Sequence, residues 1–138
     1  MNPILRNILA VIIGVAVGAF VNGQLIGISS ILVPLPEGVN PEDFESIKEN
    51  IHRYEPIHFL MPFLAHALGT FIGALLTAFI AATHKKIFAL AIGGLFLIGG
   101  IAAIILIGGP VWFSATDLIL AYLPMAWLAG IIATRKKE

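Results

Sequence analysis

Four long apolar runs, separated by shorter polar stretches, set the pattern of this chain. The runs cover approximately residues 8–32, 56–82, 87–107 and 117–134. An α-helix needs about 20 apolar residues to cross the hydrocarbon core of a bilayer, and each run approaches or exceeds that length. We therefore predict an all-α fold, an integral membrane four-helix transmembrane bundle that forms a single membrane domain over residues 1–138.

The longest polar stretch lies between the first two runs and predicts a short helix of its own. Prolines and a glycine within residues 34–38 end the first helix. Asn40 is the predicted N-cap, with Pro41 at the first helical position. Apolar residues recur at intervals of three and four within residues 44–51, so we predict an amphipathic helix over residues 41–54 at the membrane surface.

The composition strengthens the membrane assignment and excludes some classes of function. Hydrophobic residues make up 59% of the chain and charged residues only 12%, whereas soluble domains are about one-quarter charged. The lipid bilayer is therefore the predicted surrounding. The formal net charge is zero, which gives no basis for nucleic-acid binding, and the chain has no cysteine for disulfides or thiolate metal sites.

The charged residues are divided between the two ends of the predicted bundle. Six of the eight basic residues fall on one side: Arg6, Lys85, Lys86, Arg135, Lys136 and Lys137. Seven of the eight acidic residues fall on the other: Glu37, Glu42, Asp43, Glu45, Glu49, Glu55 and Asp117. The positive-inside rule then predicts a multi-pass protein of the cell (inner) membrane with both termini cytoplasmic and the polar loop outside.

Small residues recur at intervals of four in the first two runs. Gly14 and Gly18 share one face of the first helix, and Gly69 and Gly73 share a face of the second. Such spacing lets two membrane helices approach closely. We expect the second helix to be the one against which the others pack. The glycine stripes exceed what one helix contact uses, which favours a homo-oligomer or docking onto a larger membrane complex.

Five polar residues in or beside the apolar runs are the candidate ligand-binding residues. They are Asn22, Glu55, His58, His66 and Asp117. Asn22 lies on the glycine stripe and is predicted to hydrogen-bond a neighbouring helix. His58 and His66 share a face of the second helix, and Asp117 is placed in the first turn of the fourth, at the outer side.

Two further residues shape these predictions. Pro62 lies on the same helix face as the histidines and is expected to loosen the first turns of that helix. Tyr122 is expected, together with Trp112, at the headgroup level, where aromatic residues gather in membrane proteins.

Motifs for metal binding and catalysis are absent from the sequence. His58 and His66 lie eight positions apart, about 12 Å along a helix axis, so they cannot bind one metal ion from a straight helix. No nucleophile elbow, helical zinc motif or phosphate-binding loop occurs. We therefore predict no metal site and no cofactor, and a non-enzymatic role is favoured.

Three functional hypotheses follow from these observations. The first is a non-enzymatic membrane protein for packing, assembly or the binding of lipids or partners, which the glycine-rich faces favour. The second is a small transporter or channel whose polar cavity is lined by Asn22, His58 and His66. The third is a membrane enzyme or metal-binding protein that uses Glu55, His58, His66 and Asp117.

Overall fold

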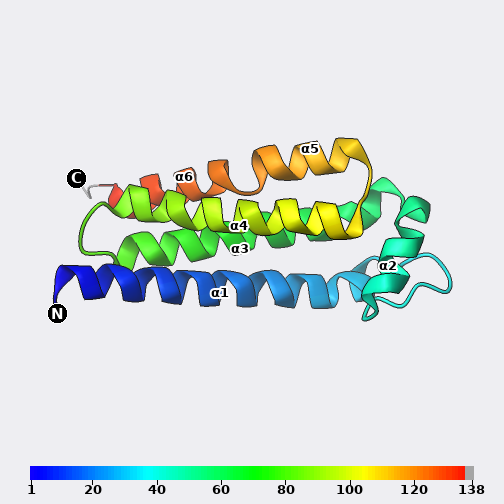
Figure 1. Ribbon diagram of the computed structural model, residues 1–138, viewed down its shortest axis with the longest axis horizontal. Helices are drawn as coiled ribbons and strands as arrows, with labels where there is room; N and C mark the ends of the chain where they lie inside the picture. Colours follow the sequence, from blue (N-terminus) through cyan, green and yellow to red (C-terminus); the bar gives the residue numbers. More distant parts are fainter. Residues whose placement is uncertain (136–138) are drawn as a thin grey trace.

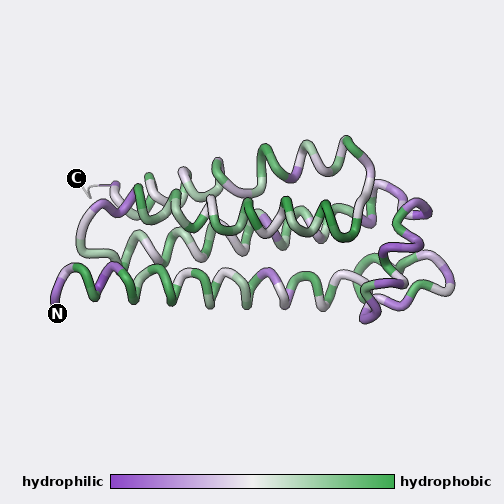
Figure 2. The backbone as a smooth tube through the Cα atoms, viewed as in Figure 1, coloured by the Kyte–Doolittle hydropathy of each residue, from purple (hydrophilic) through white to green (hydrophobic). Residues whose placement is uncertain are grey.

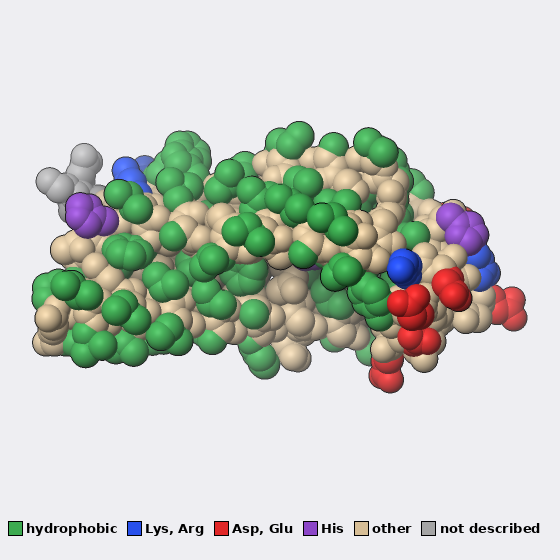
Figure 3. Space-filling view, viewed as in Figure 1, with side chains coloured by type: hydrophobic (Ala, Val, Ile, Leu, Met, Phe, Trp, Pro, Cys, Tyr) green, Lys and Arg blue, Asp and Glu red, His purple; other side chains and the backbone are tan. Residues whose placement is uncertain are grey.

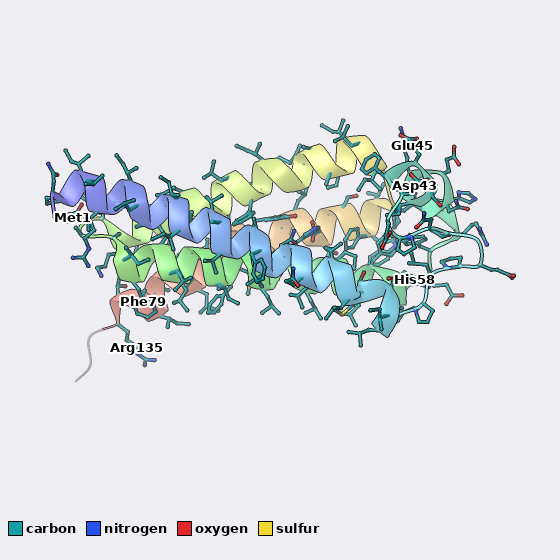
Figure 4. All side chains as sticks on the ribbon, turned by 90° about the horizontal axis from the view of Figure 1, so that it is seen from below. Met1, Asp43, Glu45, His58, Phe79 and Arg135 are labelled. Atoms are coloured by element: carbon teal, nitrogen blue, oxygen red, sulfur yellow. The ribbon has the colours of Figure 1, made fainter. Side chains whose placement is uncertain are left out.

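The computed structural model describes residues 1–135 and confirms the predicted fold class. It is all-α, with four spans that are long and apolar enough to cross a membrane and a short helix between the first two (Figure 1). Met1 and Arg135 lie at one end of the bundle, and the loop that carries the short helix lies at the other (Figure 4). Lys136 and Lys137, which contributed to the predicted orientation, lie outside the described residues.

The spans lie in the predicted parts of the chain, but the first begins at Pro3 and the fourth at Val111, five and six residues before the predicted starts at residues 8 and 117. The first three spans are α1 (Pro3–Leu32), α3 (Leu60–Ile80) and α4 (Lys85–Ile107). A 3₁₀ helix, η2 (Pro56–Phe59), leads into α3, so the first turn of this span is not α-helical. The fourth span is divided into α5 (Val111–Leu120) and α6 (Leu123–Thr134).

The loop helix forms, but its predicted N-cap is wrong. Helix α2 (Phe44–Asn50) is capped by Asp43, whose side chain accepts a hydrogen bond from the Glu45 backbone N–H at 3.1 Å. The Asn40 carboxamide instead accepts from the Glu42 N–H at 3.0 Å, within the preceding turn. Asp43 is as good a cap as Asn40, and capping there leaves Pro41 outside the helix. A short 3₁₀ helix, η1 (Ile51–Arg53), continues from α2.

Helix α3 is the centre of the bundle, as expected, and contacts α1, α4 and α6. Its closest partner is α1, because glycines face each other across the contact. A Cβ atom added to Gly14 would lie 2.6 Å from the Gly73 carbonyl oxygen, and one added to Gly69 would lie 2.8 Å from that of Gly18. Thr77 adds a hydrogen bond from its hydroxyl to the Ala10 carbonyl at 3.2 Å.

Large hydrophobic side chains cover the outside of the bundle, whereas the interior is built from small residues. The buried core consists largely of alanines on α3, α4 and α6. Hydrophobic residues run along the full length of the spans, and hydrophilic residues concentrate in the loop that contains α2 (Figure 2). An apolar exterior around a small-residue interior suits helices packed within a lipid bilayer.

Charged groups gather at the ends of the bundle. Acidic side chains cluster on the loop around α2, far from the chain's beginning (Figure 3). At the opposite end, Arg6 Nε donates to the Ile80 carbonyl at 2.5 Å and Lys85 Nζ donates to the Phe79 carbonyl at 3.3 Å. These cations satisfy terminal carbonyls of α3 and stand at the negative end of its dipole.

Candidate functional site

The fourth span is interrupted halfway along its length. Tyr122 lies between α5 and α6 with φ −115° and ψ −80°, outside helical geometry. Pro124, which has no N–H, is the second residue of α6, so the Leu120 carbonyl loses its usual intrahelical donor. The interruption brings Tyr122 back towards α5, where its hydroxyl donates to Asp117 Oδ2 at 2.9 Å.

His66 of α3 completes a polar network inside the bundle. Its Nδ1 lies 2.8 Å from Asp117 Oδ1 and 3.0 Å from Asp117 Oδ2. Its ring stacks on Tyr122, with centroids 5.8 Å apart and an angle of 27° between the planes. Asp117 is only 1% exposed and Tyr122 only 2%. We call this arrangement the His66–Asp117–Tyr122 network.

A glycine of α4 makes room for the network. A Cβ atom added to Gly100 would lie 2.6 Å from Cζ of the Tyr122 ring, so any larger residue would displace the ring. Gly100 is also in the wall of the adjoining cavity. Three spans thus hold the network in place: α3 through His66, α4 through Gly100, and the interrupted fourth span through Asp117 and Tyr122.

A cavity of about 340 Å³ extends from the network towards the loop end of the bundle. Its volume lies at the small end of the range for ligand sites, about 300–1,000 Å³. His66 and Asp117 lie in its wall among mainly apolar residues. These include Ile26, Leu35, Ile47, Ile51, Phe59, Pro62, Ala103, Ile104, Ile107 and Phe113. A few convergent polar groups in an apolar wall are typical of sites for small molecules.

His58 also lies in the cavity wall, but both of its ring nitrogens are used locally. Nδ1 accepts the Glu55 backbone N–H at 2.8 Å, and Nε2 lies 3.1 Å from the Pro34 carbonyl. An accepting Nδ1 requires the tautomer that carries its proton on Nε2, which then donates to Pro34. His58 therefore ties the loop after α1 to the start of the second span, as labelled in Figure 4.

Tyr54 closes the same part of the cavity wall. Its ring lies 5.3 Å from that of His58 and 5.8 Å from that of Phe59, measured between centroids. Burial raises the pKa of the Tyr54 phenol above its ordinary value, because the phenolate would lose hydration there. The phenol therefore stays protonated near neutral pH and offers the cavity a hydroxyl.

The five candidate residues predicted from the sequence do not converge on one point. His66 and Asp117 are in direct contact, and His58 shares their cavity. Glu55 contributes its backbone N–H to His58, and its side chain is not in the cavity wall. Asn22 lies outside the wall, beside Gly69.

Two placements from the sequence are wrong, and one predicted bond is missing. Asp117 is in the seventh position of α5, not in the first turn, because the helix already begins at Val111. Tyr122 is buried, not at headgroup level, because the interruption turns its ring inward. Asn22 Oδ1 is buried and has no hydrogen-bond partner within residues 1–135. The signal for the Tyr122 site was Pro124, whose effect on the preceding turn can be read from sequence.

The hydrogen bonds define what the network can do chemically. A His66 Nδ1–H that donates to the carboxylate leaves Nε2 as an acceptor when the ring is neutral. Asp117 receives donors from His66 and Tyr122, so its buried carboxylate is well satisfied. Within residues 1–135, Nε2 of His66 makes no hydrogen bond, so it is one of the polar side-chain atoms that the cavity wall offers to a ligand, together with those of Ser29, Ser30, Glu42 and Tyr54.

Residues 1–135 contain no set of side chains suited to binding a metal ion. Among residues 1–135, no group of three or more His, Cys, Asp or Glu side chains is placed to hold an ion. Comparisons of the chain with protein-family models, curated proteins and solved structures gave no significant match.

Proposed function

We propose that this four-span protein binds a small amphipathic molecule in the cavity above the His66–Asp117–Tyr122 network. The observation that carries the proposal is the pairing of an apolar cavity of about 340 Å³ with a histidine held by a buried carboxylate. The proposal develops the first hypothesis from the sequence, a non-enzymatic membrane protein that binds lipids or partners.

The geometry of the network favours one class of ligand. An apolar body would pack against the isoleucines and phenylalanines of the wall, where burial contributes about 25 cal/mol per Å². A hydroxyl group would donate to Nε2 of His66, whose orientation is fixed by Asp117. We therefore propose an apolar alcohol as the ligand class.

Replacing His66 tests the polar end of this site. We expect His66→Phe to weaken binding of a diazirine-bearing hexanol by about threefold to tenfold, the value of one lost hydrogen bond. The concentration dependence of photolabelling, measured on full-length protein in nanodiscs, gives the half-saturation point. His52→Phe is the matched control, because His52 is exposed in η1 and outside the cavity wall. Equal half-saturation for His66→Phe and wild type would contradict the assignment.

A second candidate function, proton-coupled transport, is favoured by the interruption of the fourth span. Ionisable residues within membrane helices often belong to proton paths, and interrupted helices often form transporter sites. The same His66→Phe variant separates the two functions. Transport requires proton flux into wild-type proteoliposomes that the variant abolishes, whereas binding alone gives no flux in either protein.

We also propose that both termini are cytoplasmic, because basic residues gather at their end of the bundle and acids at the loop end. A fluorescent-protein fusion to the C-terminus should be bright, and an alkaline phosphatase fusion there should be inactive. Phosphatase fused within residues 34–41 should be active and serves as the control. The reverse pattern would invert the topology and place the cavity on the cytoplasmic side.

Association with further copies or with a larger complex stays a prediction. Its support is that Gly23 and Gly27 of α1 and Gly94 and Gly99 of α4 would admit a Cβ atom without contact within 4 Å. Within residues 1–135, no other helix packs closely against these glycines.

A further inference from the structure

Residues of α1 and α4 both lie in the cavity wall. The two helices meet near Gly18, where an added Cβ atom would lie 2.9 Å from the Phe96 ring. Beyond that point they diverge towards the loop end of the bundle (Figure 4). The two helices contribute eight residues to the cavity wall: Ile26, Gly27, Ser29 and Ser30 of α1, and Gly100, Ala103, Ile104 and Ile107 of α4. A Cβ atom added to Gly27 would meet nothing within 4 Å, so the space beside this residue is open.

We infer that this gap is a lateral portal and that the ligand reaches the cavity sideways from the bilayer. The portal is defined by Gly27, Ala103 and Ile104. This inference rests on the proposed function and narrows its ligand class to alcohols that partition into lipid, such as long-chain alcohols, instead of water-soluble ones.

The surroundings of the portal are apolar and directed towards lipid. Ile31 on α1 and Ile105 on α4 are each 77% exposed on the outside of these helices. Such a surface offers water few polar groups to bind. A hydrocarbon chain that moves from lipid to the cavity, in contrast, stays in contact with apolar groups along its path. The flanks therefore admit an apolar molecule and disfavour a charged one.

The opposite approach, from the aqueous side, is covered by the loop. Ile47 of α2, Ile51 of η1 and Tyr54 all lie in the cavity wall, so the apolar side of the amphipathic segment forms its roof. His58 fastens this region by its hydrogen bond to the Pro34 carbonyl at 3.1 Å.

Gly27→Phe tests the portal, because its side chain would enter open space in the wall without striking the fold. The probe is a diazirine-bearing hexadecanol, partitioned into dioleoyl-phosphatidylcholine vesicles before full-length protein is added. We expect labelling of peptides covering residues 100–107 to fall about tenfold in the variant, because the added aromatic ring would fill the open space through which the alcohol enters. Gly23→Phe, one turn away and also without neighbours within 4 Å, is the control and should label like wild type.

The outcomes separate this inference from the proposed function. If hexanol labels the cavity but hexadecanol does not, or if hexadecanol labelling is unchanged by Gly27→Phe, the lateral portal is wrong and ligand binding stands. If neither alcohol labels the cavity of the wild type, both proposals are wrong. Ala103→Leu narrows the portal from α4 and should reproduce the loss, and thermal melting against Gly23→Phe shows that both variants fold.

Discussion

Replacing Asp117 with alanine should destabilise the folded bundle more than any other single side-chain truncation in the polar network. The carboxylate accepts hydrogen bonds from His66 and from Tyr122, and it is 1% exposed. Alanine leaves both donors buried without an acceptor. Each unsatisfied donor costs about 1–3 kcal/mol, so for two donors we expect a loss of about 2–6 kcal/mol in the free energy of unfolding. Steric trapping in bicelles measures that free energy for a membrane protein.

Two milder variants distinguish loss of the shared acceptor, Asp117, from loss of a single hydrogen bond to it. Tyr122→Phe removes one donor and leaves the carboxylate bound to His66, so we expect a loss of only about 0.5–1.5 kcal/mol. Asp117→Asn keeps one carbonyl oxygen and should fall between the two. In addition, ¹⁵N NMR of the His66 ring should report loss of the Nδ1–H tautomer in Asp117→Ala. A free energy of unfolding within 0.5 kcal/mol of wild type for Asp117→Ala would refute the role of the carboxylate as a shared acceptor.

The spans and the network differ in how far sequence predicts them. The spans follow from the length and apolarity of contiguous segments, because each helix must satisfy its own backbone in lipid. The His66–Asp117 contact joins residues 51 positions apart on different helices. No periodicity within one segment specifies such a contact, although both residues could be assigned to the same half of the membrane.

Local features explain the errors at the ends of the helices. The fourth span was predicted to begin at residue 117 because residues 114–117 look like a capped helix start, after Gly108, Gly109 and Pro110 end the third span. The structure turns there with φ of 85° at Gly108 and 127° at Gly109, and α5 starts at Val111 immediately afterwards. Asp117 consequently moves from a helix start to the bundle interior. Glycines at positive φ allow a turn short enough to leave the following residues for the membrane.

The close approach of α1 and α3 should make Gly14 intolerant even of alanine. An added Cβ atom would lie 2.6 Å from the Gly73 backbone oxygen and would overlap the Thr77 hydroxyl. Backbone cannot rotate away as a side chain can, so the helices must separate. Thr77 would then weaken its 3.2 Å hydrogen bond to the Ala10 carbonyl. We expect Gly14→Ala to lower the free energy of unfolding by about 1–3 kcal/mol, the usual range for overpacking.

Substitution of Gly23 by alanine should not lower the free energy of unfolding as substitution of Gly14 does. Gly23 is on the same helix, and an added Cβ atom would meet nothing within 4 Å. Alanine is favoured over glycine in a helix interior by about 0.8–1 kcal/mol, so Gly23→Ala should leave stability unchanged or raise it. Steric trapping of both variants isolates packing from helix propensity, because propensity favours alanine at both positions. Equal changes in the free energy of unfolding at Gly14 and Gly23 would mean that glycine serves α1 through its backbone flexibility. Opposite changes would identify the α1–α3 contact as the reason for glycine at position 14.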